Sequence, residues 1–180
     1  ADSCSVLAAE LPPFDVDAYL PSRKTYLDRA TEIAFAGMHL ALDDAQLDLA
    51  PLDRARTGLI LGSATGSMQT TELFFEEFVE KGPRLVKPIL FPNTYSNTTA
   101  SMLAIEYKLS GFHMNVAAGF TASAAAIVEA HDLIRSGRAD IVIAGGFEAL
   151  SDFLFTGSAR AGWLSPLDDG PETATPFAKA

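Results

Sequence analysis

One turn in the sequence has the setting of a catalytic nucleophile. It comprises Ala118, Gly119 and Phe120, after a short apolar segment and before an alanine-rich stretch with helical spacing. The first amides of a helix have no partner within the helix, and the helix dipole is positive there, so this place favours a thiolate or an oxyanion. None of the three residues carries a nucleophilic group. The turn therefore has the position of a reactive site without a reactive side chain.

Cysteine and histidine residues give no second site. Cys4 is the only cysteine, so the sequence predicts neither an internal disulfide nor a cysteine metal cluster. His39, His113 and His131 lie far apart and lack the spacing of metal ligands. Segment 62–66 (GSATG) matches neither the dinucleotide-binding nor the serine-hydrolase glycine motif, and we interpret it as a structural turn. We predict no metal and no cofactor of the chain's own.

Composition limits the classes of protein and partner. The sequence has 180 residues, of which 48% are hydrophobic, and this fits a globular domain with a sizeable core. Its formal net charge of −10 argues against nucleic acid and anionic membrane as partners. No apolar run reaches the length of a membrane span, and the first residues lack a signal-peptide pattern. We therefore predict a cytoplasmic protein.

The turn lies between two predicted strands. Residues 113–118 are short and apolar, and residues 139–145 form a continuous apolar run typical of a sheet covered on both faces. Between them, residues 120–136 have helical spacing, and Gly137 supplies a stop. The first two turns of this helix carry almost nothing larger than alanine. We therefore expect that end to be buried against close neighbours.

The remaining elements alternate in the same way. Residues 1–25, with three prolines, are predicted to be irregular surface structure. The patterns then predict, in order, a helix from a cap at Asp28 or Thr31 to about Ala45, a strand over 57–63, a helix over 68–80, an extended connection over 87–93 and a helix over 98–109. Beyond Gly146 the composition is typical of a long functional loop region. Helices that alternate with apolar strands indicate an α/β fold with a layered sheet.

Several segments, taken in order, resemble one family. They are LILGSATGSMQTTE, EKGPRLVKPILFPNTYSNTTASMLAI, GFHMNVAAGF, IRSGRADIVIAGGFEALS, WLSP and TPF. Together they resemble the N-terminal half of β-ketoacyl synthases, the condensing enzymes of fatty-acid and polyketide assembly. The resemblance covers residues 22–180 and implies a thiolase-like layered fold (α-β-α-β-α), of which this chain holds the N-terminal half only. It divides the chain into an irregular segment, 1–25, and a half domain, 26–180.

The resemblance places Phe120 where the family carries its nucleophilic cysteine. In the family this turn reads Thr-Ala-Cys, and the cysteine takes the acyl chain from an acyl carrier protein as a thioester. Counting forward from Gly111 and back from Gly137 gives the same position. Phenylalanine has no group that forms a thioester, so acyl transfer through it is excluded. A shifted register would place Ser123 there instead, but it breaks the ungapped match.

The resemblance implies that the remaining catalytic groups of the family are missing as well. Two histidines and a glycine-rich oxyanion donor lie in the C-terminal half of the family, after the PF motif that this chain reaches at 176–177. The resemblance therefore implies a non-catalytic subunit, like the chain-length factors that pair with a competent ketosynthase and shape the tunnel for the growing chain. Those subunits commonly carry glutamine at the position of Phe120, so phenylalanine is a further departure. The chain is then either a fragment of a longer protein or a half-fold that borrows layers from a partner.

The resemblance also implies partners and an interface. The dimer-interface and tunnel-wall candidates are Thr94, Tyr95, Asn97, Thr98, Met102, His113, Asn115 and Phe120. The expected partner is a ketosynthase homologue in a heterodimer or a higher heteromer. Acyl carrier proteins are acidic, so we expect the carrier protein to dock mainly on that partner, unless Arg54, Arg56, Lys81 and Arg84 form a basic patch. Phosphopantetheine is expected only as the group that the carrier protein carries.

Three other interpretations stay open at the level of the sequence. In the first interpretation, Phe120 only fills space in the core and has no functional role, because aromatic residues usually pack in the interior. Alternatively, the chain is part of an active condensing enzyme or decarboxylase whose remaining residues lie elsewhere. In the third interpretation it is a structural homologue that uses a thiolase-like interface for assembly alone.

Overall fold

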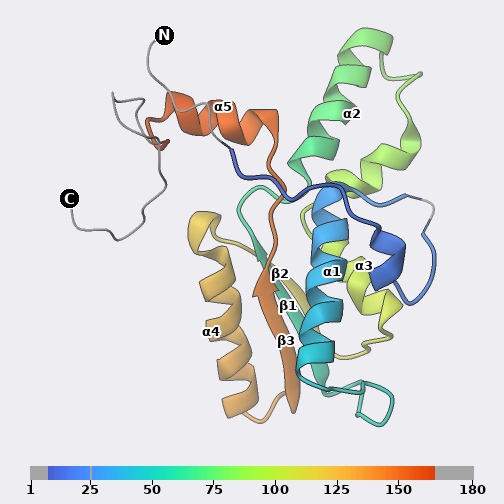
Figure 1. Cartoon of the computed structure of the whole chain (residues 1–180), viewed down its shortest axis with the longest axis vertical. Coiled ribbons are helices and arrows are strands. Elements are labelled where there is room, and N and C mark those ends of the chain that lie inside the picture. Colours follow the sequence, from blue (N-terminus) through green and yellow to red (C-terminus); the bar gives the residue numbers. More distant parts are fainter. Residues whose placement is uncertain (1–7, 25, 165–180) are drawn as a thin grey trace.

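The structure is a computed structural model that describes residues 8–24 and 26–164. Cys4 and the TPF segment lie outside the described residues. In chain order the elements are η1 (Val16–Tyr19), α1 (Arg29–Asp44), β1 (Thr57–Ser63), α2 (Met68–Lys81), η2 (Pro88–Thr94), α3 (Thr98–Glu106), β2 (His113–Ala117), η3 (Gly119–Thr121), α4 (Ala122–Arg135), β3 (Ile141–Gly146) and α5 (Asp152–Arg160), where η marks a short 3-10 helix (Figure 1).

The described strands form one parallel sheet in the order β2-β1-β3. Leu59 of β1 lies opposite His113 of β2, and Thr57 of β1 lies opposite Ile141 of β3. Every residue of β1 is buried, as expected for the central strand of a sheet covered on both faces. Because parallel neighbours need a crossover, the connections between these strands contain α2, α3 and α4.

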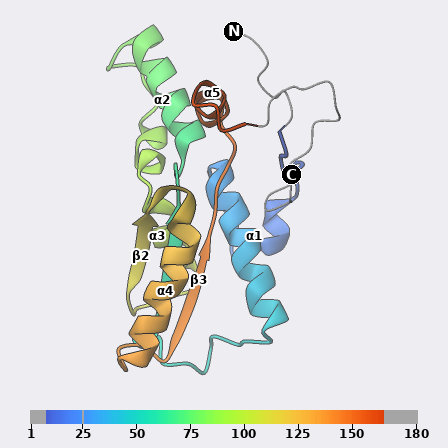
Figure 2. The same ribbon diagram turned by 90° about the vertical axis from the view of Figure 1, so that its left-hand side faces the viewer.

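Helices cover both faces of the sheet. Leu59 and Leu61 of β1 belong to a buried cluster with Phe35 of α1 and Leu103 of α3. Ile60 points the other way, into a cluster that includes Ala126 of α4. The two views agree that α4 lies on one face and that α1 and α3 lie on the other (Figures 1 and 2). The chain is thus an α/β fold in layers, as predicted.

Two glycines let α4 start directly on the sheet. A Cβ built on Gly62 at the end of β1 would come within 2.3 Å of the backbone of Ala122, the first residue of α4. One built on Gly146 at the end of β3 would lie 1.7 Å from Oγ of Ser123. The absence of side chains at these two positions therefore sets the height of the α4 N-terminus above the carboxyl ends of the strands.

A buried polar network connects three helices at the same end of the sheet. Asp28 caps α1, because its carboxylate accepts a hydrogen bond from the Thr31 amide at 2.7 Å. Its other oxygen accepts one from Ser67 at the start of α2, also at 2.7 Å. Thr31 and Thr99 of α3 share a bond of 2.8 Å between their hydroxyls. These bonds satisfy buried groups and fix the helix ends relative to one another.

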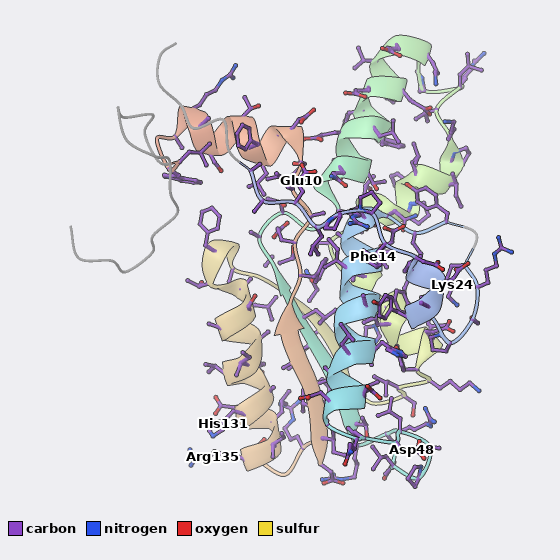
Figure 3. All side chains as sticks on the ribbon, viewed as in Figure 1. Glu10, Phe14, Lys24, Asp48, His131 and Arg135 are labelled. Carbon is purple, nitrogen blue, oxygen red and sulfur yellow. The ribbon has the colours of Figure 1, made fainter. Side chains whose placement is uncertain are left out.

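The described part of the N-terminal segment is held against the helices. The guanidinium of Arg29 donates to the carbonyls of Leu11 and Pro12, each at 2.9 Å, and lies 4.6 Å from the ring centre of Phe14. Lys24 forms an ion pair with Glu106 of α3. Figure 3 shows Phe14 near the upper end of α1 and Lys24 farther out on the same side. Apart from η1, residues 8–24 contain no regular structure.

Several local predictions were wrong. The segment 87–93, predicted to be extended, contains η2 with Pro88 at its start. The region after Gly146, predicted to be a long loop, contains α5. Strands β2 and β3, both predicted to be buried, are the two edges of the described sheet, where each is flanked by β1 alone: β2 is largely exposed and β3 is half-buried. The start of α4 is buried on one face only: Ala122 and Ala126 are covered, whereas Ser123 is exposed.

The helices of the described residues are all too short or too polar to cross a membrane. No group of three or more histidine, cysteine, aspartate or glutamate side chains among these residues could hold a metal ion.

Candidate functional site

The carboxyl ends of the three strands meet at one edge of the sheet. The chain leaves β1 at Ser63, β2 at Ala117 and β3 at Gly146, and the parallel register brings these ends together. In open parallel sheets this edge is where ligands bind. Helix α4 starts at the same edge, so its free amides face the space above the strands. The predicted turn at 118–120 therefore lies where a site is expected.

Phe120 lies on η3, between β2 and α4, and its side chain is 74% exposed. Its ring meets that of Trp163 edge to face, with the ring centres 5.3 Å apart. Trp163 follows α5 and is also exposed. Phe120 is thus not part of either buried cluster, which excludes the interpretation as core filler within the described chain.

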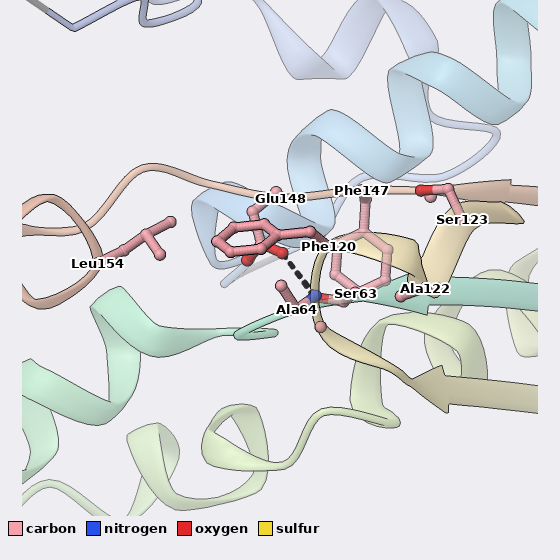
Figure 4. Close-up of a pocket in the computed structure, with 11 residues that line it drawn as sticks. Ser63, Ala64, Phe120, Ala122, Ser123, Phe147, Glu148 and Leu154 are labelled. Carbon is pink, nitrogen blue, oxygen red and sulfur yellow. Dashed lines mark hydrogen bonds between the residues drawn. The ribbon is translucent and has the colours of Figure 1, made fainter. Parts of the chain in front are cut away.

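A pocket of about 290 Å³ opens beside Phe120. Glycine backbone forms its floor at Gly62 and Gly146, and Phe147 and Leu154 supply apolar walls. Figure 4 shows the Phe120 ring between Leu154 on the left and Ser63 and Ala122 on the right, with Glu148 beside it. The pocket is therefore an apolar space at the N-terminus of α4, and Glu148 supplies its one carboxylate.

Glu148 clamps the loop that follows β1. Its carboxylate accepts hydrogen bonds from the Ala64 amide at 2.7 Å, from the Thr65 amide at 3.2 Å and from the hydroxyl of Ser63 at 3.2 Å. It also accepts one from the Thr65 hydroxyl. Ser63 in turn accepts a bond from the Gly66 amide at 2.7 Å. Segment 62–66 is therefore a structural turn, as predicted, and Glu148 fixes its shape.

Sequence reasoning missed Glu148. The available signal was a single acid directly after the apolar strand and its two glycines, in GGFEAL. A charged residue in that place needs partners, since an unpaired buried carboxylate is costly. Its partners lie 83 to 85 positions away in the sequence, so only the folded chain identifies them.

The pocket lacks the groups of an acyl-transfer site. Glu148 is the only titratable residue among those that line it, and its oxygens are already engaged. The hydroxyl of Thr121, next to Phe120, donates to the Ala118 carbonyl at 2.9 Å. Ser123 lines the pocket, but no histidine or lysine lies among the lining residues to activate it. The described pocket can hold an apolar group, but it has no paired nucleophile and base.

The interface candidates divide into two groups in space. Those of η2, α3 and β2 are neighbours: Thr98 donates to the Pro92 carbonyl at 2.5 Å, and the Ser101 hydroxyl lies 3.5 Å from Nε2 of His113. The members of this group are Thr94, Tyr95, Asn97, Thr98, Met102, His113 and Asn115. Phe120 belongs to the pocket instead, and none of the others lines it. Their role at an interface or tunnel wall stays a prediction.

The four basic residues do not form a single patch. Arg54 and Arg56 lie at the start of β1, whereas Lys81 and Arg84 lie at the far end of α2, beyond the opposite edge of the sheet (Figure 1). Arg56 forms two hydrogen bonds of 2.6 Å with Asp140, which lower the pKa of that carboxyl. Arg54 donates to the Tyr107 carbonyl at 2.5 Å. These guanidinium groups serve the chain's own structure.

Fold and site together define the class of protein. A parallel sheet between helices, with a strand-turn-helix unit at its carboxyl edge, is the N-terminal half of a thiolase fold. The family profile described as beta-ketoacyl synthase, N-terminal domain, matches residues 10–179. The chain therefore belongs to the β-ketoacyl synthase family.

Individual relatives agree with this assignment. The 3-oxoacyl-[acyl-carrier-protein] synthase 2 of Staphylococcus aureus is 29% identical over 173 residues, which are 95% of this chain and 43% of the relative. The synthase of the same name from Vibrio cholerae is 31% identical over 164 residues, 90% of this chain and 40% of the relative. The chain thus spans less than half the length of these curated relatives.

Solved structures show the same fold. A β-ketoacyl synthase from Burkholderia phymatum superimposes with a TM-score of 0.83 at 27% identity, over 98% of this chain and 44% of that one. The ishigamide ketosynthase/chain length factor gives a TM-score of 0.80 at 24% identity, over 87% of this chain and 40% of that one. A ketosynthase in complex with its chain length factor from Xenorhabdus doucetiae gives 0.66 at 20% identity, over 88% and 39%. The last two similarities concern the fold alone.

Proposed function

We propose that this chain is a non-catalytic, chain-length-factor-like subunit that pairs with a competent β-ketoacyl-ACP synthase in fatty-acid or polyketide assembly. The observation that carries the proposal is Phe120, an exposed ring at the turn where the family resemblance expects the nucleophilic cysteine. The pocket beside it holds one carboxylate, already bound by the chain itself. In this role the chain shapes the acyl tunnel, and the partner performs the condensation.

Strand β2 offers a surface for such pairing. It is an edge strand whose second side faces no other described strand, and its residues His113 and Met114 are exposed. Unpaired edges invite another chain to add to the sheet. Several of the predicted interface residues lie on β2 and on the adjacent α3. Two of the structurally similar proteins are a ketosynthase/chain length factor and a ketosynthase in complex with its chain length factor, which supports a heteromer.

Chemical labelling of the native complex tests this assignment. A thiol-directed inhibitor of condensing enzymes should modify the cysteine of the partner subunit and leave Cys4, the only thiol in the sequence of this chain, unmodified. Native mass spectrometry of the same sample should show this chain together with a ketosynthase homologue. Condensing activity in a preparation that contains this chain alone would refute the proposal.

A second candidate function is an active condensing enzyme whose remaining residues lie elsewhere. The close seating of α4 on Gly62 and Gly146 favours it, because that arrangement would still suit a nucleophile at the helix N-terminus. Phe120→Cys in a Cys4→Ala background separates the two. If the missing groups are present, the variant should condense acyl chains. If they are absent, it should gain only a reactive thiol.

Placing the new thiol at the other end of α4 gives the matched control. Ser136 lies at the opposite, C-terminal end of α4 and is exposed. The positive end of the helix dipole lowers a thiol pKa, whereas the negative end does not, so Phe120→Cys should react with iodoacetamide faster than Ser136→Cys. Equal rates would mean that the turn has lost its activating geometry.

A further inference from the structure

Helix α5 supplies one wall of the pocket beside Phe120. Leu154 of α5 and Phe120 of η3 both line the pocket, and Figure 4 shows the two side chains next to each other. Figure 1 shows α5 above the start of α4, apart from the layered core. The position of α5 relative to the turn at 118–120 therefore sets the width of the pocket.

The N-terminal end of α5 is fastened to α2. The side-chain amide of Gln69 donates to the Leu150 carbonyl, and the Phe153 amide donates to the carboxylate of Glu72 at 2.6 Å. Both bonds end on backbone atoms in or just before the first turn of α5. This end of the helix is therefore a fixed point about which the remainder can turn.

The C-terminal end of α5 has a Schellman motif, which fixes Trp163 to the helix. The Gly162 amide donates to the Ala159 carbonyl at 3.1 Å, and the Trp163 amide donates to the Ser158 carbonyl at 3.0 Å. Gly162 has a φ of 70°, in the left-handed region that favours glycine. Trp163 therefore moves with α5 as part of one unit.

An aromatic contact closes this end of α5 onto the core. The rings of Trp163 and Phe120 meet edge to face, with an angle of 80° between their planes. Within residues 8–24 and 26–164, no hydrogen bond or ion pair joins residues 156–163 to another element. The exposed fractions are 66% for Trp163 and 74% for Phe120, so water already reaches most of both rings. A contact of this kind is weak enough to open in local fluctuations.

We propose that α5 is a lid over the pocket, hinged where α2 holds its N-terminal end and latched by the contact between Phe120 and Trp163. Release of the latch moves Leu154 away from Phe120 and widens the pocket for the apolar chain of an acyl thioester. A ligand that binds the open form better shifts the lid towards it, so occupancy of the pocket and opening are coupled. The ligand class rests on the proposed function, whereas the latch rests on contacts within this chain.

Calorimetric titration of the chain with the N-acetylcysteamine thioester of decanoic acid tests the coupling. Trp163→Ala should bind this probe about fivefold more tightly than the parent, because an edge-to-face pair contributes on that order to keeping the lid closed. The matched control is Phe153→Ala, which removes an exposed ring of α5 that lines a different groove and should leave the affinity unchanged. Equal or weaker binding by Trp163→Ala would overturn the proposal, as would equal tightening in Phe153→Ala or no binding by any of the three proteins.

Fluorescence tests the latch directly, because Trp163 is the only tryptophan in the sequence. Phe120→Ala should make Trp163 more accessible to quenching by acrylamide, whereas Phe153→Ala should follow the parent. The decanoyl thioester should raise the quenching of the parent towards that of Phe120→Ala, since the bound lid is open. Unchanged quenching in Phe120→Ala, with the fold intact by far-UV circular dichroism, would overturn the latch.

These measurements fail separately from the proposed function. They use the chain alone and require neither a partner subunit nor condensation. Condensing activity of the chain alone would refute the non-catalytic assignment and leave the quenching result standing. Unchanged quenching would refute the latch and leave the assignment to the labelling experiment.

Discussion

Glu77 shows how one ionised side chain joins helix α2 to the start of η2. The hydrogen bond from Lys81, followed by those from the side chain and amide of Lys87, lowers its pKa from 4.5 to about 2, although burial opposes this. Because the folded-state pKa lies below the unfolded value, its stabilising effect is complete above about pH 4.5. It is lost as the pH falls from 4.5 towards 2.

Glu77→Gln should therefore destabilise the chain in a pH-dependent way. The neutral amide cannot replace the charge between the two ammonium groups, so the free energy of unfolding should be lower than that of the parent at pH 7. The difference should shrink below pH 4.5 and vanish near 2, where the parent carboxylate is protonated as well. Urea unfolding followed by far-UV circular dichroism at several pH values measures this.

Glu80→Gln is the control for this effect. Glu80 is exposed on the same helix, and no ion-pair partner for it lies within the described residues. Exposed charges without a partner contribute little, so this variant should follow the parent at every pH. A pH-dependent loss of equal size in both variants would assign the effect to the net charge of α2.

At the scale of elements, the seating of α4 depends on missing side chains. Gly62→Ala should cost about 1–3 kcal/mol of unfolding free energy, because the new Cβ would meet rigid backbone of Ala122 at 2.3 Å. Gly146→Ala should cost less when Ser123 is also changed to glycine, since the two nearest atoms that the new Cβ meets, at 1.7 and 2.7 Å, belong to that side chain. Thermal and urea unfolding of the single and double variants measure both effects.

Gly37→Ala on α1 is the control, and for this variant we expect a higher free energy of unfolding. Nothing lies within 4 Å of a Cβ built there, and the residue is exposed inside a helix. Alanine has the better helix propensity, so this variant should gain about 0.5–1 kcal/mol. If Gly62→Ala were as stable as Gly37→Ala, α4 would have room to move on the sheet, and its fixed position over the pocket would be refuted.

The same elements show what the sequence could predict. The strand over 57–63 and the helix that begins at Asp28 agree with the structure because apolar periodicity and caps are local signals. The prolines in 87–93 led to the prediction of an extended segment. Proline also suits the first position of a short helix, because an amide at that position would have no partner within the helix. Helix α5 was missed although Ser151 caps it, its hydroxyl accepting from the Leu154 amide at 3.1 Å.

Contacts distant in the sequence were out of reach of such reasoning. The bonds of Glu148 to the loop after β1, and the pairing of Arg56 with Asp140, join residues more than eighty positions apart. The position of Phe120 was predictable, because the turn follows from its flanking strand and helix. Its neighbour Trp163 was not, because the segment after Gly146 gave no clear sequence signal for its path.

At the scale of the whole molecule, charge decides how an acyl carrier protein would meet this chain. The chain carries a net charge of −10, and its basic residues near β1 and α2 lie at opposite ends of the structure. Arg56 and Lys81 are moreover paired with Asp140 and Glu77. Arg54, Arg56, Lys81 and Arg84 therefore offer an acidic carrier protein no continuous basic surface, and with the net charge of −10 repulsion at low ionic strength is expected.

We therefore expect the carrier protein to bind the complex with the ketosynthase, but not this chain alone. Isothermal titration at low salt should give heat with the heteromer and with the isolated ketosynthase, and none with this chain, because only the partner would offer complementary charge. Added salt should weaken the binding that is seen. Binding to this chain alone with the affinity of the complex would instead locate the docking surface on this chain. The subunit would then bind the carrier protein itself in addition to shaping the tunnel.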